Sequence, residues 1–288
     1  YTTKIDKDVV ISTWQSIYKM PRKYFEQFGC VIGDEAHMFK AKSLTGIMTK
    51  LHQCKYRFGL TGTLDGSQTH KLVLEGLFGT AEKVVSTKEL IDKKTLANLK
   101  IKCIVLKHPT RKERMTYAEE MDYIVSREFR NNFILDLCNT ISGNTLCLFQ
   151  LVEKHGKILY DGMKGSENVY FVYGGTDTEQ REKIRGLVEG HTKSTTIASY
   201  GTFSTGINIR NINNIVLASP SKSKIRVLQS IGRGLRTSST KDSILIFDIA
   251  DDISYGERRN FTLNHFFERI NIYNEEQFNY EISKVKIK

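Results

Sequence analysis

Between residues 146 and 247, apolar runs of strand length alternate with helical patterns, and few folds accommodate such an alternation. The runs are rich in Val, Ile, Leu and Phe. Strands of this composition that alternate with helices predict a parallel sheet covered by helices on both faces. The expected strands are Leu146–Phe149, Val169–Tyr173, Thr195–Ser199, Ile215–Ala218 and Ile244–Phe247, and the expected helices are Val152–Met163, Thr178–Glu189 and Ser223–Leu235.

The first part of the chain repeats this alternation with fewer strands. A doubly wound sheet usually has five or six strands, so this lobe is predicted to be incomplete. The pattern predicts strands at Val9–Thr13, Cys30–Gly33 and Arg57–Leu60, and helices at Trp14–Phe28, Ser43–His52 and His70–Phe78.

A polar, lysine-rich stretch between residues 79 and 112 separates the two regions. We therefore expect an α/β protein with two lobes, residues 1–90 and 91–288. Within the second lobe, a strand is expected in "IKCIVL" and a long helix over Arg114–Ile141. A helical tail should dock on this lobe through Phe266, Ile270 and Tyr273, which share one helix face.

The composition is that of a globular protein, with 40% hydrophobic and 26% charged residues. No apolar run approaches the roughly 20 residues that cross a bilayer, so no membrane partner is expected. The five cysteines are scattered without a C-x-x-C pair, which favours buried thiols in a reducing compartment. The net charge of +11 favours a polyanionic partner such as nucleic acid.

Two adjacent carboxylates, Asp34 and Glu35, directly follow the expected strand Cys30–Gly33. Ligands of open α/β sheets gather at the carboxyl ends of strands. One carboxylate there could hold Mg²⁺, and the other could orient or deprotonate an attacking water. His37 follows, but it has no second histidine four residues away, so the zinc pattern H-E-x-x-H is absent. The alternative is a solvated acidic loop without chemistry.

Two later segments carry further candidate chemistry. In "QSIGRGLR", Gln229, Arg233 and Arg236 fall on one face of an expected helix, where the arginines could clamp phosphate oxygens or simply face solvent. Gly232 and Gly234 disfavour a plain helix interior, which suggests a close approach at this point. "ASYGTFSTGINI", residues 198–209, places glycines and hydroxyls after a strand, as a phosphate-binding loop or a simple connector would.

The order of these segments resembles the motif series of superfamily-two helicases and translocases. Asp34-Glu35-Ala36-His37 is similar to motif II, Thr61-Gly62-Thr63 to motif III, Tyr200–Asn208 to motif V and Gln229–Arg236 to motif VI. "DVVISTWQSIYK" resembles the segment before motif II, and the likeness covers most of residues 8–250. It implies two RecA-like lobes with parallel sheets and an ATP-driven motor that unwinds or branch-migrates branched DNA in recombination, replication and repair.

The resemblance also implies roles for individual residues. Asp34 would hold Mg²⁺, and Glu35 would activate the attacking water. Arg233 and Arg236 would reach the γ-phosphate of ATP across the cleft between the lobes. The remaining implied roles are nucleotide contacts for Gly206 and Asn208, coupling for His37, Thr61, Thr63 and Gln229, and nucleic-acid contacts for Thr13, Gln15 and Thr202. Asn208 departs from the pattern, because many relatives carry Asp there.

The phosphate cradle G-x-x-x-x-G-K-S/T does not occur in the sequence. We therefore expect the 288 residues alone to hydrolyse ATP poorly, with the cradle supplied by a preceding part of the same chain. A degenerate relative that never had a cradle remains an alternative.

Three other functions stay open: a non-hydrolysing nucleic-acid clamp, a helicase directed to RNA, and a metallohydrolase that uses Asp34, Glu35 and His37. The motifs do not separate single-stranded DNA, branched DNA and RNA–DNA hybrids as partners. The chain also resembles phage recombination helicases, and this likeness extends through the tail "HFFERINIY". It implies the cytoplasm of an infected bacterial cell.

Overall fold

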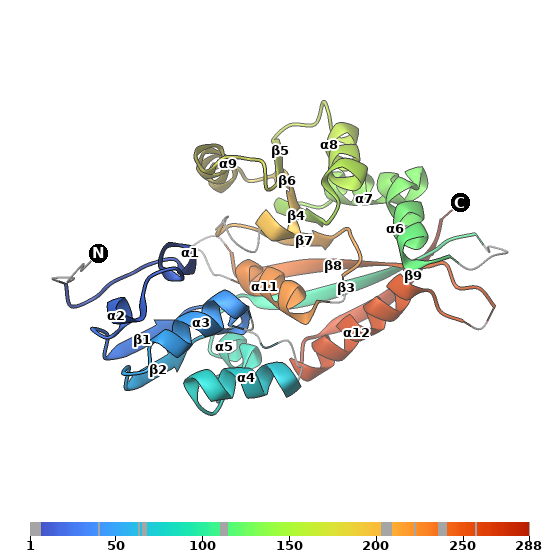
Figure 1. The fold of residues 1–288 in the computed structure, drawn as a ribbon. Coiled ribbons are helices and arrows are strands. Elements are labelled where there is room, and N and C mark those ends of the chain that lie inside the picture. Colours follow the sequence, from blue (N-terminus) through green and yellow to red (C-terminus); the bar gives the residue numbers. More distant parts are fainter. Residues whose placement is uncertain are drawn as a thin grey trace. The chain divides into compact units, whose positions relative to one another are not determined.

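The computed structural model describes residues 7–39, 41–62, 64, 68–109, 115–202, 209–221, 223–235, 241–256 and 258–287. The chain forms two compact units, Tyr1–Val84 and Val85–Lys288 (Figure 1). Each contains parallel strands with helices packed against them. The prediction of two α/β lobes, the first with the smaller sheet, is confirmed.

The first unit is built around two parallel strands in its described part. β1 pairs with β2 from Cys30↔Tyr56 to Gly33↔Gly59. One face of this pair packs through Val31 on a cluster from α2, α3 and α4 that includes Phe25, Met48 and Leu74. The elements are α1 (Trp14–Ile17), α2 (Arg22–Phe25), β1 (Cys30–Gly33), the 3₁₀ turn η1 (Ala36–Met38), α3 (Lys42–Lys50), β2 (Tyr56–Gly59) and α4 (Gln68–Phe78).

Two sequence predictions in this unit are wrong. Residues Val9–Thr13 form no strand, although their composition is that of one. The helix expected over Trp14–Phe28 is divided into α1 and α2. Pro21 stands immediately before α2 with an extended ψ of 158°, and a proline is tolerated at a helix start but not in its interior. It therefore ends one helix and begins the next.

The second unit contains a sheet of seven parallel strands in its described part, in the order β5-β6-β4-β7-β8-β3-β9. Its elements are α5 (Thr87–Asp92), β3 (Asn98–Lys107), α6 (Tyr117–Ser126), α7 (Glu128–Thr140), β4 (Asn144–Phe149), the π-helical turn η2 (Val152–Gly156), α8 (Lys157–Gly162), β5 (Val169–Val172), α9 (Thr178–Gly190), β6 (Ser194–Ser199), β7 (Asn214–Leu217), α11 (Lys224–Gly234), β8 (Ser243–Asp252), α12 (Phe261–Glu275) and β9 (Tyr280–Lys286).

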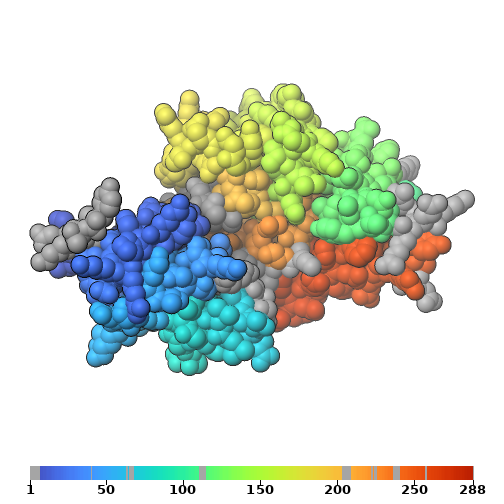
Figure 2. Space-filling view, viewed as in Figure 1, coloured from blue at the N-terminus to red at the C-terminus, as the bar shows by residue number. Residues whose placement is uncertain are grey.

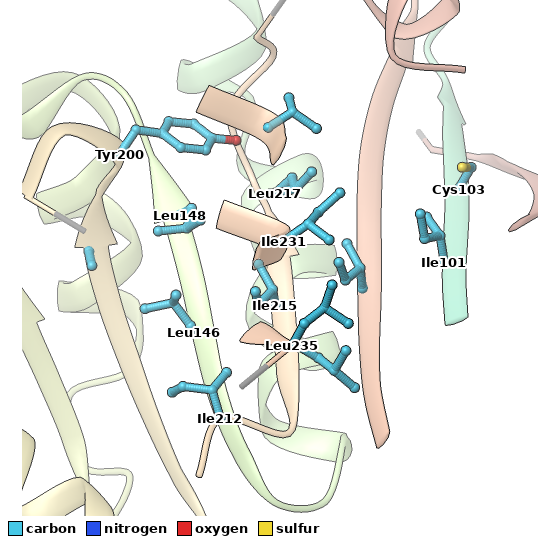
Figure 3. Packing of buried hydrophobic residues seen from close by; sticks show 14 of the residues in the cluster. Ile101, Cys103, Leu146, Leu148, Tyr200, Ile212, Ile215, Leu217, Ile231 and Leu235 are labelled. Atoms are coloured by element: carbon cyan, nitrogen blue, oxygen red, sulfur yellow. The ribbon is translucent and has the colours of Figure 1, made fainter. Parts of the chain in front are cut away.

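Two apolar clusters cover opposite faces of this sheet. One joins the strands to α9, α11 and α12, and the other joins them to α7 and α8. Figure 3 shows part of the first cluster, where Ile231 of α11 and Leu235, the residue after this helix, lie against Leu146 and Ile215. The strands at the centre, β4, β6 and β7, are buried along their whole length. This explains why β4 and β7 read as largely apolar runs rather than as alternating patterns.

The second unit also corrects some predicted elements. The helix expected over Arg114–Ile141 is broken at Arg127, whose ψ of 114° is extended, and residues 110–114 lie outside the described part. The expected helix Val152–Met163 begins as the π-helical turn η2. Strand β9 was not predicted, because its polar residues in "YEISKVK" do not form an apolar run.

Buried ion pairs fix helices to both faces of β8. Arg269 of α12 lies 2.7 Å from a carboxylate oxygen of Asp248, which also accepts a hydrogen bond from Tyr273. Arg130 of α7 lies 2.8 Å from Asp251. Since residues 248 and 251 are an odd number of positions apart, they face opposite sides of the sheet. The tail helix α12 therefore docks as predicted, through its apolar stripe and through Arg269.

Candidate functional site

In the first unit, the loops after β1 and β2 are tied together. Leu60 donates its backbone N–H to the carbonyl of Gly33, and Ala36 donates to the carbonyl of Leu60, both at 2.8 Å. Asp34 and Glu35, after β1, and Thr61, after β2, therefore lie at the same edge of the sheet. At such an edge, the carboxyl ends of parallel strands bring ligand-binding residues together.

Asp34 and Glu35 occupy the turn between β1 and η1. Glu35 has φ 50° and ψ 49°, a left-handed conformation that costs a non-glycine residue about 1–2 kcal/mol. Its backbone N–H donates to Asp34 Oδ1 at 2.9 Å. Both residues are exposed, with 54% of the Glu35 side chain accessible. Backbone strain of this kind concentrates at functional sites, and here it accompanies two accessible carboxylates.

His37 is the buried member of this loop, with 5% of its surface exposed. Its Nδ1 lies 2.9 Å from Thr61 Oγ1 and 3.2 Å from Glu35 Oε2. The imidazole thus touches both a carboxylate after β1 and a hydroxyl after β2. Thr63 lies outside the described residues.

Two glycines and two phenylalanines support this edge, and the sequence pattern did not identify them. A Cβ on Gly33 would come within 2.9 Å of Phe39, and one on Gly59 within 2.9 Å of Phe78. The two rings pack edge to face with centroids 5.0 Å apart. Glycines at both strand ends allow the rings to lie directly on the backbone. A detectable signal was a glycine at or next to the end of each of two expected strands, Cys30–Gly33 and Arg57–Leu60.

In the second unit, α11 carries Gln229 and Arg233, both half-buried, while Arg236 lies outside the described residues. The glycines beside Arg233 differ in their surroundings. A Cβ on Gly234 would come within 2.7 Å of Ile215 and closer still to Ile244, whereas nothing lies within 4 Å of one on Gly232. The close approach expected from the sequence is therefore that of α11 to its own sheet.

The other predicted contact residues are divided between surface and interior. Thr13 and Gln15 are exposed at the start of α1, and the Thr13 hydroxyl lies 3.0 Å from that of Ser16. Thr202 is buried after β6, with Oγ1 2.8 Å from Ser199 Oγ. Gly206 and Asn208 lie outside the described residues. The Thr202 hydroxyl thus already has a protein partner.

The residues of the first unit fit a magnesium ion with a nucleotide. Mg²⁺ is commonly held by one or two carboxylates together with waters and phosphate oxygens, and Asp34 and Glu35 are accessible for this. Among the described residues, no group of three or more His, Cys, Asp and Glu could hold a metal ion. A magnesium ion that shares its ligands with a nucleotide does not need such a group.

No helix in the described part of the chain is both long and apolar enough to cross a bilayer.

Comparison with known protein families finds one match in each unit. Residues 2–66 match the family described as type III restriction enzyme, res subunit, and residues 128–238 match the helicase conserved C-terminal domain. With the motif order and the two parallel sheets, these matches show that the chain belongs to the superfamily-two helicases.

Within that superfamily, the chain is similar to the ATP-dependent DNA helicase UvsW of Enterobacteria phage T4. It is 35% identical over 99% of this chain and 60% of the relative. The crystal structure of T4 UvsW superposes with a TM-score of 0.58 over 98% of this chain and 58% of that one. A fragment of a putative HsdR subunit of a type I restriction enzyme from Vibrio vulnificus gives 0.70 at 15% identity, which shows the fold alone. The chain thus spans less than two thirds of these relatives.

Proposed function

We propose that this chain is part of an ATP-dependent DNA helicase or translocase that remodels branched DNA. The observation that carries the proposal is the loop of Asp34, Glu35 and His37, which joins the carboxyl ends of two parallel strands through the His37–Thr61 contact. The name of the T4 relative, an ATP-dependent DNA helicase, supports the reaction and the DNA substrate. The net charge of +11 supports a polyanionic partner.

In the proposed reaction, Asp34 holds Mg²⁺ and Glu35 orients the attacking water and accepts its proton. The magnesium ion neutralises charge on the β- and γ-phosphates when it is bound. Arg233 and Arg236 stabilise the charge that develops on the transferred phosphoryl group. Arginines in this role are worth about 10³–10⁵ in rate. His37 transmits the state of Glu35 to Thr61, as their contacts allow.

The test is ATP turnover by a protein that contains these 288 residues together with a phosphate cradle. Glu35→Gln should lower DNA-stimulated turnover by at least about 10²-fold, since a positioned base contributes about 10²–10⁴. Glu26→Gln removes the same charge from an exposed glutamate of the same unit and should leave the rate unchanged. Wild-type turnover by Glu35→Gln would refute the assigned roles.

The substrate is tested separately with single-stranded DNA, branched DNA and single-stranded RNA as activators of the same protein. The proposal expects the largest stimulation with branched DNA. Stimulation by RNA alone would support an RNA helicase instead. Nucleic-acid binding without any turnover, in a protein that binds ATP, would favour the non-hydrolysing clamp.

A further inference from the structure

Arg226 extends the polar face of α11 by one turn toward its N-terminus. It precedes Gln229 by three residues and Arg233 by seven, so the three side chains lie on one side of the helix. The residue is half-buried and its backbone N–H donates to the Ser223 hydroxyl that caps the helix. Residues near 225–235, in orange, reach the surface in Figure 2.

The Arg226 guanidinium is held on an aromatic ring. Its central carbon lies 5.5 Å from the ring centroid of Tyr200, within the range of a cation–π contact. Tyr200 is itself fixed, because its ring is buried in the core beside Leu148 (Figure 3) and its hydroxyl donates to the carbonyl of Ser219 at 3.0 Å. This contact therefore restrains the guanidinium in the absence of a ligand.

Among the described residues, few polar groups engage this guanidinium. Within the described part of the chain, it makes one hydrogen bond, from an Nη1 donor to Gln150 Oε1 at the long distance of 3.5 Å. An arginine has five N–H donors. Arg130 and Arg269, which also contact this sheet, differ from Arg226. Both are buried, and each forms an ion pair with a carboxylate of β8. Arg226 has no carboxylate partner among the described residues.

The position of Arg226 places it where ligands of parallel sheets bind. Gln150 directly follows β4, Tyr200 directly follows β6, and Ser219 lies just past β7. These three strands are neighbours in the sheet, in the order β6-β4-β7. Their carboxyl ends form one continuous edge, and a forked, pre-oriented cation at this edge suits an anionic oxygen.

We propose that Arg226, held by Tyr200 and flanked by Gln150, binds a backbone phosphate of single-stranded nucleic acid. This inference rests on the proposed function, since it supplies a nucleic-acid contact for the second unit. It also has a mechanical consequence. Arg226 and Arg233 lie two turns apart on the same helix, so a rigid α11 would connect a nucleic-acid contact with the arginine proposed to stabilise the transferred phosphoryl group.

The test measures binding of a fluorescein-labelled dT20 oligonucleotide by anisotropy, with the 288-residue chain between about 50 and 200 mM salt. Arg226→Gln should weaken binding about tenfold. It should also reduce the slope of log K against log salt by about 0.7, the contribution of one single-strand phosphate. Arg226→Lys keeps the charge but loses the planar fork, so its affinity should be intermediate.

Arg185→Gln is the matched control. It removes the same charge from the same unit, at an α9 arginine that already pairs with Glu182 and Glu189. Equal effects of Arg226→Gln and Arg185→Gln on affinity and slope would overturn the Arg226 contact, while wild-type binding of dT20 would leave the proposed function standing. Failure of the wild-type chain to bind dT20 at the lowest salt would overturn both.

A competition experiment distinguishes a nucleic-acid phosphate from a nucleotide phosphate. Magnesium ATP should leave wild-type dT20 binding unchanged if Arg226 contacts the strand. Displacement of dT20 by ATP from the wild-type chain, but not from Arg226→Gln, would assign Arg226 to the nucleotide and overturn the proposal. Thermal melting by circular dichroism establishes that each variant is folded. If Arg226→Gln does not fold, Arg226→Lys tests the proposal, because its affinity for dT20 should be lower than that of the wild-type chain.

Discussion

The two parallel sheets of this protein place their motif loops alike but are stabilised differently. In the second unit, helices cover both faces, and β4, β6 and β7 are buried throughout. In the first unit, a helical cluster covers one face of β1 and β2, while Ile32 and Phe58 are 63% and 53% exposed. Within the described residues, the motif loop after β1 is therefore supported from one face of its sheet. Its support can be local, as with the two phenylalanines that pack on Gly33 and Gly59.

The largest expected effect comes from breaking a buried ion pair of the covered sheet. Arg269→Met leaves Asp248 buried without its cation, which should lower the free energy of unfolding of the second unit by about 3–5 kcal/mol. Urea denaturation followed by circular dichroism measures this loss. Asp248→Leu added to Arg269→Met should recover much of it, because an apolar pair carries no unpaired charge.

Arg185→Met is the control for this prediction, because its guanidinium is paired at the surface, where such pairs are worth little. A loss below about 1 kcal/mol for Arg269→Met would contradict the view that these pairs hold α12 on the sheet.

The second prediction concerns the fit of α11 on the same sheet. Gly234→Ala would push a methyl group into Ile215 and Ile244 and should cost about 1–3 kcal/mol. Gly232→Ala meets nothing within 4 Å and should stabilise the helix by up to about 1 kcal/mol. Both variants add the same atom two residues apart, so the difference isolates packing. Thermal unfolding of the pair measures it, and equal shifts in Tm would refute the close packing.

A third prediction uses a buried histidine of the second unit. Burial, reinforced by the charge of Arg130, lowers the pKa of His155 to about 3. The unfolded chain binds this proton near pH 6.5 and the folded chain does not, so stability is retained above that pH and falls as the pH decreases. Between pH 7 and pH 5 the second unit should lose about 2 kcal/mol.

Urea denaturation across this pH range tests the prediction, and His155→Gln should flatten the dependence whatever its own stability. Asp251, whose carboxyl is buried but whose pKa Arg130 and His108 bring down to about 2, contributes only at lower pH. An unchanged pH slope in His155→Gln would show that other groups take up the protons.

The sequence was most informative where the sheet is buried on both faces. The strands expected within residues 146–247 are all present, and the buried strands β4 and β7 stand out as apolar runs. The prediction from the sequence failed where tertiary contacts or exposed positions determine the structure. Strand β9 is polar and lies at the sheet edge, and its pairing with β3 depends on contacts distant in sequence.

The candidate site likewise combines residues whose positions the sequence predicts with contacts that depend on the tertiary fold. The positions of Asp34, Glu35 and Gln229 follow from motifs and from where the strands and helices end. The hydrogen bond between His37 and Thr61 joins residues 24 positions apart, so no local pattern specifies it. Arg226 lies outside the motif, and its contact with the Tyr200 ring depends on how α11 packs on the sheet.

The smallest expected effect belongs to the open face of the first unit. Ile32→Thr changes a largely exposed side chain and should alter the free energy of unfolding by less than about 0.5 kcal/mol. Ile215→Thr, the same substitution in the covered sheet, loses buried apolar contacts and buries a hydroxyl, and should cost about 2–3 kcal/mol. Urea denaturation of both variants compares the two sheets directly. If Ile32→Thr costs as much as Ile215→Thr, the face over β1 and β2 is covered in solution, and the two sheets do not differ in the way their burial indicates.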